Sequence, residues 1–107
     1  MGTPNILQNV PAALPRELVE VLAAGSSCRI ERIVSTGQAS PPGFWFDQEW
    51  DEWVIVLSGS ARVRFEGGQE HCLVQGSYLH IPSHLKHRVE FTDTAQPTVW
   101  LAFHFPG

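Results

Sequence analysis

The sequence contains little positive charge. Seven Lys and Arg residues stand against 11 Asp and Glu residues, which gives a formal net charge of -4 at pH 7. The basic residues are scattered along the chain and form no cluster. A protein that binds a nucleic-acid backbone needs a basic patch or stripe. We therefore expect no nucleic acid among the partners of this protein.

Cysteine is also scarce, and long apolar runs are absent. Cys28 and Cys72 allow one disulfide at most, and in a non-secreted chain we expect both to remain buried or half-buried thiols without a metal or redox role. No segment approaches the ~18 consecutive apolar residues of a membrane span. The first ten residues lack the basic and then apolar pattern of a signal peptide. These absences predict a cytoplasmic protein with no membrane partner.

The sequence does contain enough apolar residues for one packed core. Its 107 residues are 43% hydrophobic and 17% charged, which is not the composition of a disordered or fibrous chain. A chain of this length has room for one compact unit. We expect a single domain over residues 1–107, with an N-terminal segment over 1–25 and the main body over 28–105.

Residues 15–25 have the pattern of a short helix. Pro15 lies where the first turn would begin and Gly25 just past the end, as is common at helix termini. Leu18, Val19 and Leu22 would then share one face. The pattern predicts a short N-terminal helix that covers an open edge or end of the main body and has a structural role.

The remainder of the chain consists of short strand-like segments separated by turn signals. Alternation is clearest where Val63 and Phe65 are interleaved with charged residues, so we expect both to face the core. Helices do not alternate with strands, which argues against a parallel α/β sheet and favours a sandwich or a small barrel. The predicted strands cover residues 28–36, 53–57, 61–66, 70–74, 78–81, 89–91 and 98–105.

Two of these strands each present a potential metal ligand. Glu52 abuts the apolar run 53–57, and His87 follows the strand that Pro82 closes. A carboxylate and an imidazole on separate strands converge only if the sheet curls. Such a pair suits zinc, iron, nickel or manganese. Asp47, Glu49 and Asp51 lie in the same acidic stretch, but we interpret these three as solvated, because a charge run is usually an exposed surface.

The spacing of these residues resembles the two motifs of the cupin superfamily. Glu52 followed by Gly59 resembles the end of the first motif, Glu-x6-Gly. The second motif runs Gly-x5-Pro-x-Gly-x2-His-x3-Asn, and here the corresponding residues are Gly76, Pro82, His84, His87 and Phe91. The resemblance covers residues 44–105. It implies an all-β fold of the double-stranded β-helix type, a small barrel of two antiparallel sheets with a pocket at one end.

The resemblance also implies a metal site, which this sequence matches only in part. Glu52 and His87 occupy motif ligand positions. The His-x-His pair of the first motif falls on Phe46 and Gln48 or, in a longer spacing, on Trp45 and Asp47, so both histidines are missing. The second motif has His84 in place of glycine and Phe91 in place of asparagine.

Several residues are candidates to complete this ligand set. Gln48 lies an even number of residues from Glu52, so on one strand both would share a face, and we take it first, with Asp47 in reserve. Either gives an oxygen-rich site that favours manganese or iron(II). His104 shares strand parity with Trp100 and is a second reserve ligand, against the alternative of a satisfied core histidine. His84 is a candidate proton carrier, an outer hydrogen-bond donor to a ligand, or an exposed loop residue.

Three functions are compatible with the sequence. The first is a small metal-binding cupin that takes a small organic ligand in its pocket. The second is a metal-free binding or sensor module, and the third is a metal-free isomerase or epimerase. Trp45 and Phe46, beside a loop rich in proline and glycine, are the aromatic residues most expected to touch a ligand or a second subunit. Because small sheets gain from covered edges, we expect a symmetric homodimer.

Overall fold

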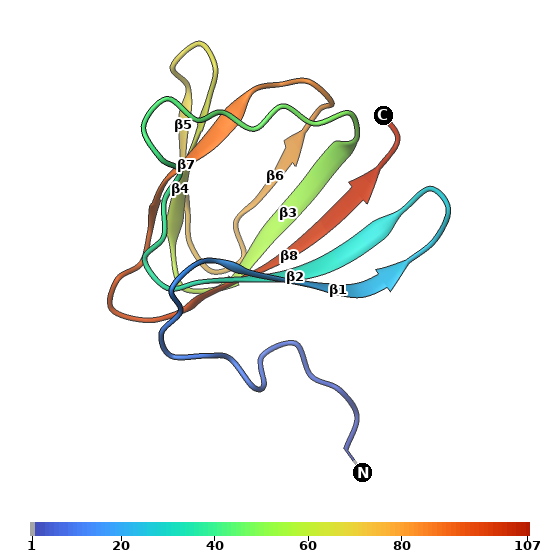
Figure 1. The fold of residues 1–107 in the computed structure, drawn as a ribbon, viewed down its shortest axis with the longest axis vertical. Coiled ribbons are helices and arrows are strands. Elements are labelled where there is room, and N and C mark those ends of the chain that lie inside the picture. The colour runs from blue at the N-terminus through green and yellow to red at the C-terminus, as the bar shows by residue number, and fades with distance from the viewer. Residues whose placement is uncertain (1) are drawn as a thin grey trace.

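The computed structural model describes residues 2–107, which form two antiparallel sheets (Figure 1). The first sheet has five strands in the order β1-β2-β8-β3-β6, and the second has three in the order β5-β4-β7. Within residues 2–107 no helix occurs, and so none could span a membrane. The strands are β1 (Leu18–Ala24), β2 (Arg29–Ser35), β3 (Asp51–Ser58), β4 (Ala61–Phe65), β5 (Glu70–Leu73), β6 (Tyr78–Ile81), β7 (His87–Thr92) and β8 (Thr98–Phe105).

The prediction of a short N-terminal helix over residues 15–25 is wrong. The segment forms β1, an edge strand that pairs antiparallel with β2, with Leu18 opposite Val34 and Val21 opposite Glu31. The β-branched side chains of Val19 and Val21 favour extended backbone. Pairing along β2 favours the strand over the helix because it satisfies the backbone hydrogen bonds of an edge that would otherwise be open.

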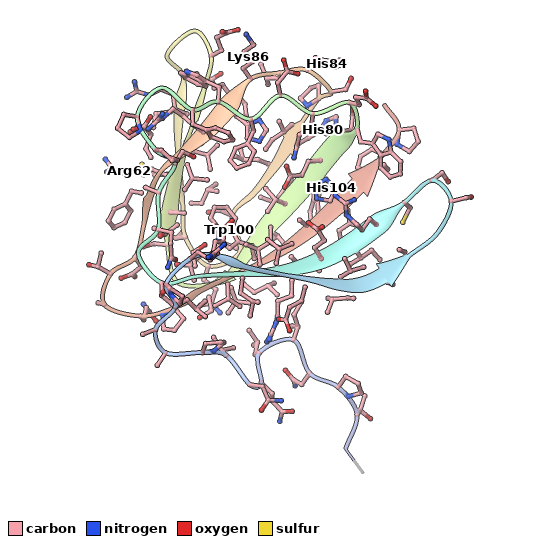
Figure 2. The ribbon with its side chains drawn as sticks, viewed as in Figure 1. Arg62, His80, His84, Lys86, Trp100 and His104 are labelled. Carbon is pink, nitrogen blue, oxygen red and sulfur yellow. The ribbon has the colours of Figure 1, made fainter. Side chains whose placement is uncertain are left out.

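The core lies between the two sheets. Its buried residues are contributed by both sheets, and Trp100 of β8 is visible between them in Figure 2. Val63 is 2% exposed, and Phe65 packs against the same cluster, so the expected orientation of β4 is confirmed. The buried cluster comprises Val54, Val56, Ala61, Val63, Leu73, Ile81, Trp100 and Ala102.

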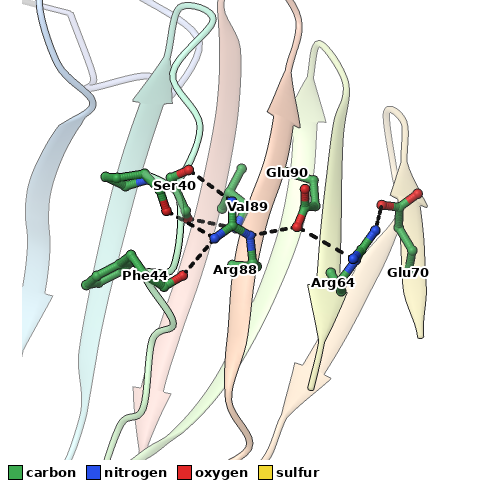
Figure 3. A network of polar contacts seen from close by, with 8 residues as sticks. Ser40, Phe44, Arg64, Glu70, Arg88, Val89 and Glu90 are labelled. Atoms are coloured by element: carbon green, nitrogen blue, oxygen red, sulfur yellow. Dashed lines mark hydrogen bonds and ion pairs between the residues drawn. The ribbon is translucent and has the colours of Figure 1, made fainter. Parts of the chain in front are cut away.

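The segment 36–50 connects β2 to β3 and runs beside β7 on the way. Arg88 of β7 fixes it: its guanidinium donates hydrogen bonds to the carbonyl oxygens of Ser40, Pro41 and Phe44 at 3.1, 3.0 and 3.1 Å, and to Glu90 at 2.6 Å (Figure 3). Further along, Phe46 and His87 exchange backbone hydrogen bonds in an isolated bridge. These contacts hold the end of the segment over the space between the sheets.

Candidate functional site

A cavity of about 190 Å³ opens between the two sheets. This is below the roughly 300–1,000 Å³ of pockets for drug-sized ligands, so it fits a small molecule. Its polar lining consists of Glu17, Arg29, Glu31, Gln48, Glu52, His87 and His104. Its apolar lining consists of Val19, Ile33, Phe46, Val54, Val63, Ile81, Val89 and Trp100.

Glu52 and His87 come from different sheets and face each other in this cavity. The distance from Glu52 Oε1 to His87 Nε2 is 3.8 Å, too long for a hydrogen bond, and the two side chains are only 10% and 6% exposed. His87 Nδ1 lies 3.0 Å from the carbonyl oxygen of Leu85. Because a carbonyl only accepts, Nδ1 carries the proton and Nε2 presents a lone pair toward Glu52. The ring of Phe46 stacks on the imidazole at 5.3 Å.

Gln48 lines the same cavity as Glu52. Its Oε1 atom is buried and has no hydrogen-bond partner, and its backbone oxygen accepts a hydrogen bond from the His84 backbone nitrogen at 2.7 Å. Gln48 precedes β3, which begins at Asp51, so strand parity with Glu52 does not explain its position. The pairing of segment 36–50 with β7 and the turn after β6 places it there.

The reserve ligand Asp47 and the candidate proton carrier His84 pair with each other away from the cavity lining. His84 Nδ1 lies 2.8 Å from Asp47 Oδ1, and the two side chains are 66% and 43% exposed. In Figure 2, His84 lies at the upper rim of the molecule. Both residues therefore belong to the surface around the site rather than to its lining.

His104, the second reserve ligand, does point into the cavity. It lies opposite Glu52 in the pairing of β8 with β3, and it is 5% exposed. Its Nε2 atom, however, lies 2.9 Å from Glu31 Oε1, while the other oxygen of Glu31 accepts a hydrogen bond from Arg29 Nε at 2.7 Å. The pairing with Glu31 occupies His104 Nε2, so His104 shapes the cavity wall.

The remaining histidines and the cysteines lie outside the cavity lining. His80 Nε2 lies 2.7 Å from Asp51 Oδ2, and His71 packs against the ring of Phe65. Asp51 is only 7% exposed, because His80 and the backbone nitrogen of Ser83 bind its carboxylate, so the expectation that it is solvated is wrong. Cys28 and Cys72 are both exposed free thiols, and no disulfide joins them.

Two glutamates of the cavity were missed by sequence reasoning. Glu31 lies on β2, and Glu17 precedes β1. Glu17 Oε2 accepts a hydrogen bond from Ser35 Oγ at 2.7 Å, and Ser35 Oγ in turn accepts one from Trp100 Nε1 at 3.1 Å. The helix interpretation of residues 15–25 hid Glu17. A strand interpretation puts Glu17 and Val19 on one face, and that parity is the signal that could have found it.

The carboxylates of the cavity perturb one another. Burial and, to a lesser extent, the nearby charges of Glu31 and Glu17 together raise the pKa of Glu52 to about 7, while Arg29 opposes them. Burial also raises the pKa of Glu17. For His87, burial lowers the pKa, so the imidazole is neutral at pH 7. The cavity thus combines a neutral imidazole with carboxyl groups that are costly to ionise.

The two antiparallel sheets, with an imidazole and a carboxyl group facing a cavity between them, define a barrel of the double-stranded β-helix class. Residues 31–104 match the cupin domain family, and the chain therefore belongs to that family. No curated protein matches the sequence significantly.

Solved structures agree with this assignment. A protein from Ralstonia eutropha JMP134, proposed to be a mannose-6-phosphate isomerase, is 45% identical to the chain, with a TM-score of 0.95 and 100% of both chains covered. A cupin superfamily protein from Desulfitobacterium hafniense DCB-2 has a TM-score of 0.79 at 19% identity, covering 100% of this chain and 94% of its own. An RmlC-like cupin from Desulfovibrio desulfuricans has a TM-score of 0.74 at 20% identity, covering 100% and 99%. The last two show the fold alone.

Proposed function

We propose that this cupin binds a divalent metal ion through Gln48, Glu52 and His87 and takes a small organic ligand in the same cavity. The observation that carries the proposal is the buried, unpartnered Oε1 atom of Gln48 in the cavity that Glu52 and His87 share. A buried polar atom without a partner costs about 1–3 kcal/mol, so such an atom in a lining points to a missing ligand.

The donor atoms suit such an ion. Within residues 2–107, no three His, Cys, Asp or Glu side chains are grouped to hold a metal, so the amide of Gln48 has to complete the set. Glu52 Oε1 and His87 Nε2 lie 3.8 Å apart, a separation that two ligands of one ion can span at the usual ~2.0–2.2 Å each. The hydrogen bond from His87 Nδ1 to the Leu85 carbonyl fixes the imidazole for coordination.

A bound ion of this kind supplies Lewis-acid or oxygen-binding chemistry. The residues of the chain supply the environment. Phe46 holds the His87 ring by stacking on it, and the apolar lining excludes water from the ligand. Glu31 pairs with His104 Nε2 and so keeps that nitrogen from binding the ion.

Elemental analysis of protein made without a polyhistidine tag tests the proposal. After reconstitution with iron(II), manganese or zinc, we expect near-stoichiometric metal in the natural protein and nearly none in Glu52→Ala and His87→Ala. Glu49→Ala and His80→Ala are matched controls, because Glu49 and His80 are exposed and do not line the cavity. If the natural protein retains no metal after reconstitution, the proposed metal site is wrong. Full metal content in both cavity variants would contradict the residue assignment.

Gln48 is tested by two substitutions of opposite expected effect. Gln48→Leu removes the oxygen donor and should weaken metal binding. Gln48→His supplies an imidazole, a ligand suited to zinc and iron, and should strengthen it. Titration of both variants with zinc against a competing chelator measures the difference. If the two substitutions change the affinity equally, Gln48 is not a ligand.

A second candidate function is proton transfer by Glu52 and His87 without a metal, as in an isomerase. Two observations favour it: the two groups face each other, and a relative at 45% identity is proposed to be an isomerase. A carboxyl group with a pKa of about 7 is well matched to acid–base catalysis at neutral pH. Isomerase activity that persists after chelation and is lost in Glu52→Gln would favour this candidate over the metal site.

A further inference from the structure

The cavity has a second polar anchor besides the proposed metal ligands. Glu17 lies on the side of β1 and β2, whereas Gln48 and His87 come from segment 36–50 and β7. The chain of hydrogen bonds from Trp100 Nε1 to Ser35 Oγ and from Ser35 Oγ to Glu17 Oε2 orients the Glu17 carboxylate. Ser35 is fully buried, so this chain is a fixed part of the wall. Within residues 2–107 no group donates a hydrogen bond to Glu17 Oε1, so this oxygen is available to a ligand in the cavity.

Acidic groups outnumber basic groups around the cavity. Glu31 is already satisfied by Arg29 and His104, and Arg29 is the only arginine or lysine among the residues that line it. Glu52 makes no hydrogen bond, although its side chain is only 10% exposed and has little contact with water. The basic atom nearest to its carboxyl group is His87 Nε2, at 3.8 Å. Glu17 and Glu52 are therefore two carboxyl groups for which the protein provides no cation.

From this imbalance we infer that the cavity selects a small organic cation, a primary amine whose ammonium group binds Glu17 while its apolar part contacts the cavity wall. The inference rests on the proposed function, in which a metal ion engages Glu52 and leaves Glu17 for the ligand. The aromatic rings of Phe46 and Trp100 in the same lining also favour a cationic group.

The same charges disfavour an anionic ligand such as a sugar phosphate. A phosphate group is normally held by arginine, lysine or a row of backbone N–H groups. Here the one arginine is engaged by Glu31, and a phosphate would lie close to two further carboxyl groups. The relative from Ralstonia eutropha is named for a phosphorylated sugar substrate. The charges of this cavity do not suit a ligand of that kind.

Three probes of different charge test the inference: butylammonium, butanoate and mannose 6-phosphate. Binding at pH 7.5 is followed by the NMR signal of the Trp100 indole N–H, which reports on Ser35 and Glu17 through the hydrogen-bond chain. We expect butylammonium to shift this signal in a saturable way, and butanoate and mannose 6-phosphate to leave it unchanged. Tighter binding of either anion than of butylammonium would overturn the inference. This comparison needs only the natural protein.

Glu17→Gln identifies the anchor. Loss of the carboxylate should weaken butylammonium binding about tenfold or more, which is the expected cost of losing one charged hydrogen-bond partner. Glu49→Gln removes one exposed carboxylate outside the cavity and should bind as the natural protein does. Unchanged affinity in Glu17→Gln would overturn the assignment of the anchor.

The outcome is separable from that of the metal proposal. Binding is measured on chelated protein and on zinc-loaded protein, and metal content is measured independently in both. If the protein holds no metal but butylammonium binds through Glu17, the metal site fails and the amine site stands. If zinc binds stoichiometrically and the amine does not bind either form, the amine site fails and the metal site stands.

Discussion

At the scale of single residues, His84 has an unusual backbone conformation. Its φ is +63°, in the left-handed region, where a side chain is strained and glycine is not. The cupin motif has glycine at this position, which agrees with the backbone that the turn after β6 adopts. The His84 side chain makes its hydrogen bond to the exposed Asp47, and an exposed pair of this kind contributes little to the stability of the fold.

We therefore expect His84→Gly to be more stable than His84→Ala by about 1 kcal/mol, because both lose the contact with Asp47 but only alanine keeps the left-handed strain. Urea unfolding of the two variants measures the difference. Both should keep the metal content of the natural protein, since His84 does not line the cavity. Equal stability of the two variants would show that the φ angle imposes no strain.

The residues of the site differ in how far the sequence could predict them. Glu52 and His87 lie together in the cavity because motif spacing reflects the positions of β3 and β7 in the barrel. Gln48 lies there too, although the parity argument does not apply, because two residues with bent backbone separate it from β3. Glu17 could not be found from a motif: it depends on the pairing of β1 with β2, which is a contact between distant segments.

At the scale of elements, the turn between β3 and β4 depends on Gly59. Its φ is +88°, and a Cβ atom placed there would lie 2.6 Å from the Cα atom of Thr98. Gly76 has nearly the same φ, +89°, but nothing lies within 4 Å of a Cβ atom built on it. The two glycines therefore separate the cost of backbone strain from the cost of steric overlap.

Gly76→Ala should destabilise the protein by about 1–2 kcal/mol through the backbone alone. Gly59→Ala carries the same cost and adds an overlap with backbone atoms of Thr98, so we expect it to lose at least ~1 kcal/mol more. Chemical unfolding of both variants gives the two values. Equal losses would mean that the start of β8 moves away without cost.

The elements themselves were predictable where pattern and pairing agree. The seven strands predicted from residue 28 onward correspond to β2 through β8, because turn signals separate these segments along the chain. Residues 18–24 fit a helical pattern of apolar residues, but they also carry Val19 and Val21, whose branched side chains favour a strand. The segment becomes a strand because it can pair with the free edge of β2. A single sequence does not show which strand edges are free.

At the scale of the whole molecule, the fold encloses carboxyl groups that resist ionisation. The pKa of Glu52 is about 7 in the folded protein, against 4.5 for an ordinary glutamate. Below pH 4.5 the group is protonated in both states and has no effect on stability. Between pH 4.5 and about 7 the unfolded chain releases the proton while the folded chain keeps it, so a rise in pH lowers the free energy of unfolding.

We expect Glu52→Gln to cancel this loss in chelated protein. Relative to the natural protein, the variant should gain up to roughly 3 kcal/mol in the free energy of unfolding between pH 4.5 and pH 8, with no further gain at higher pH. Urea unfolding of the variant and of the natural protein across this range measures the gain. Adding zinc at pH 8 should reverse the order, because only an ionised Glu52 holds the ion and stabilises the fold by binding it. A stability difference between Glu52→Gln and the natural protein that does not change with pH would show that Glu52 ionises in the fold as readily as in water.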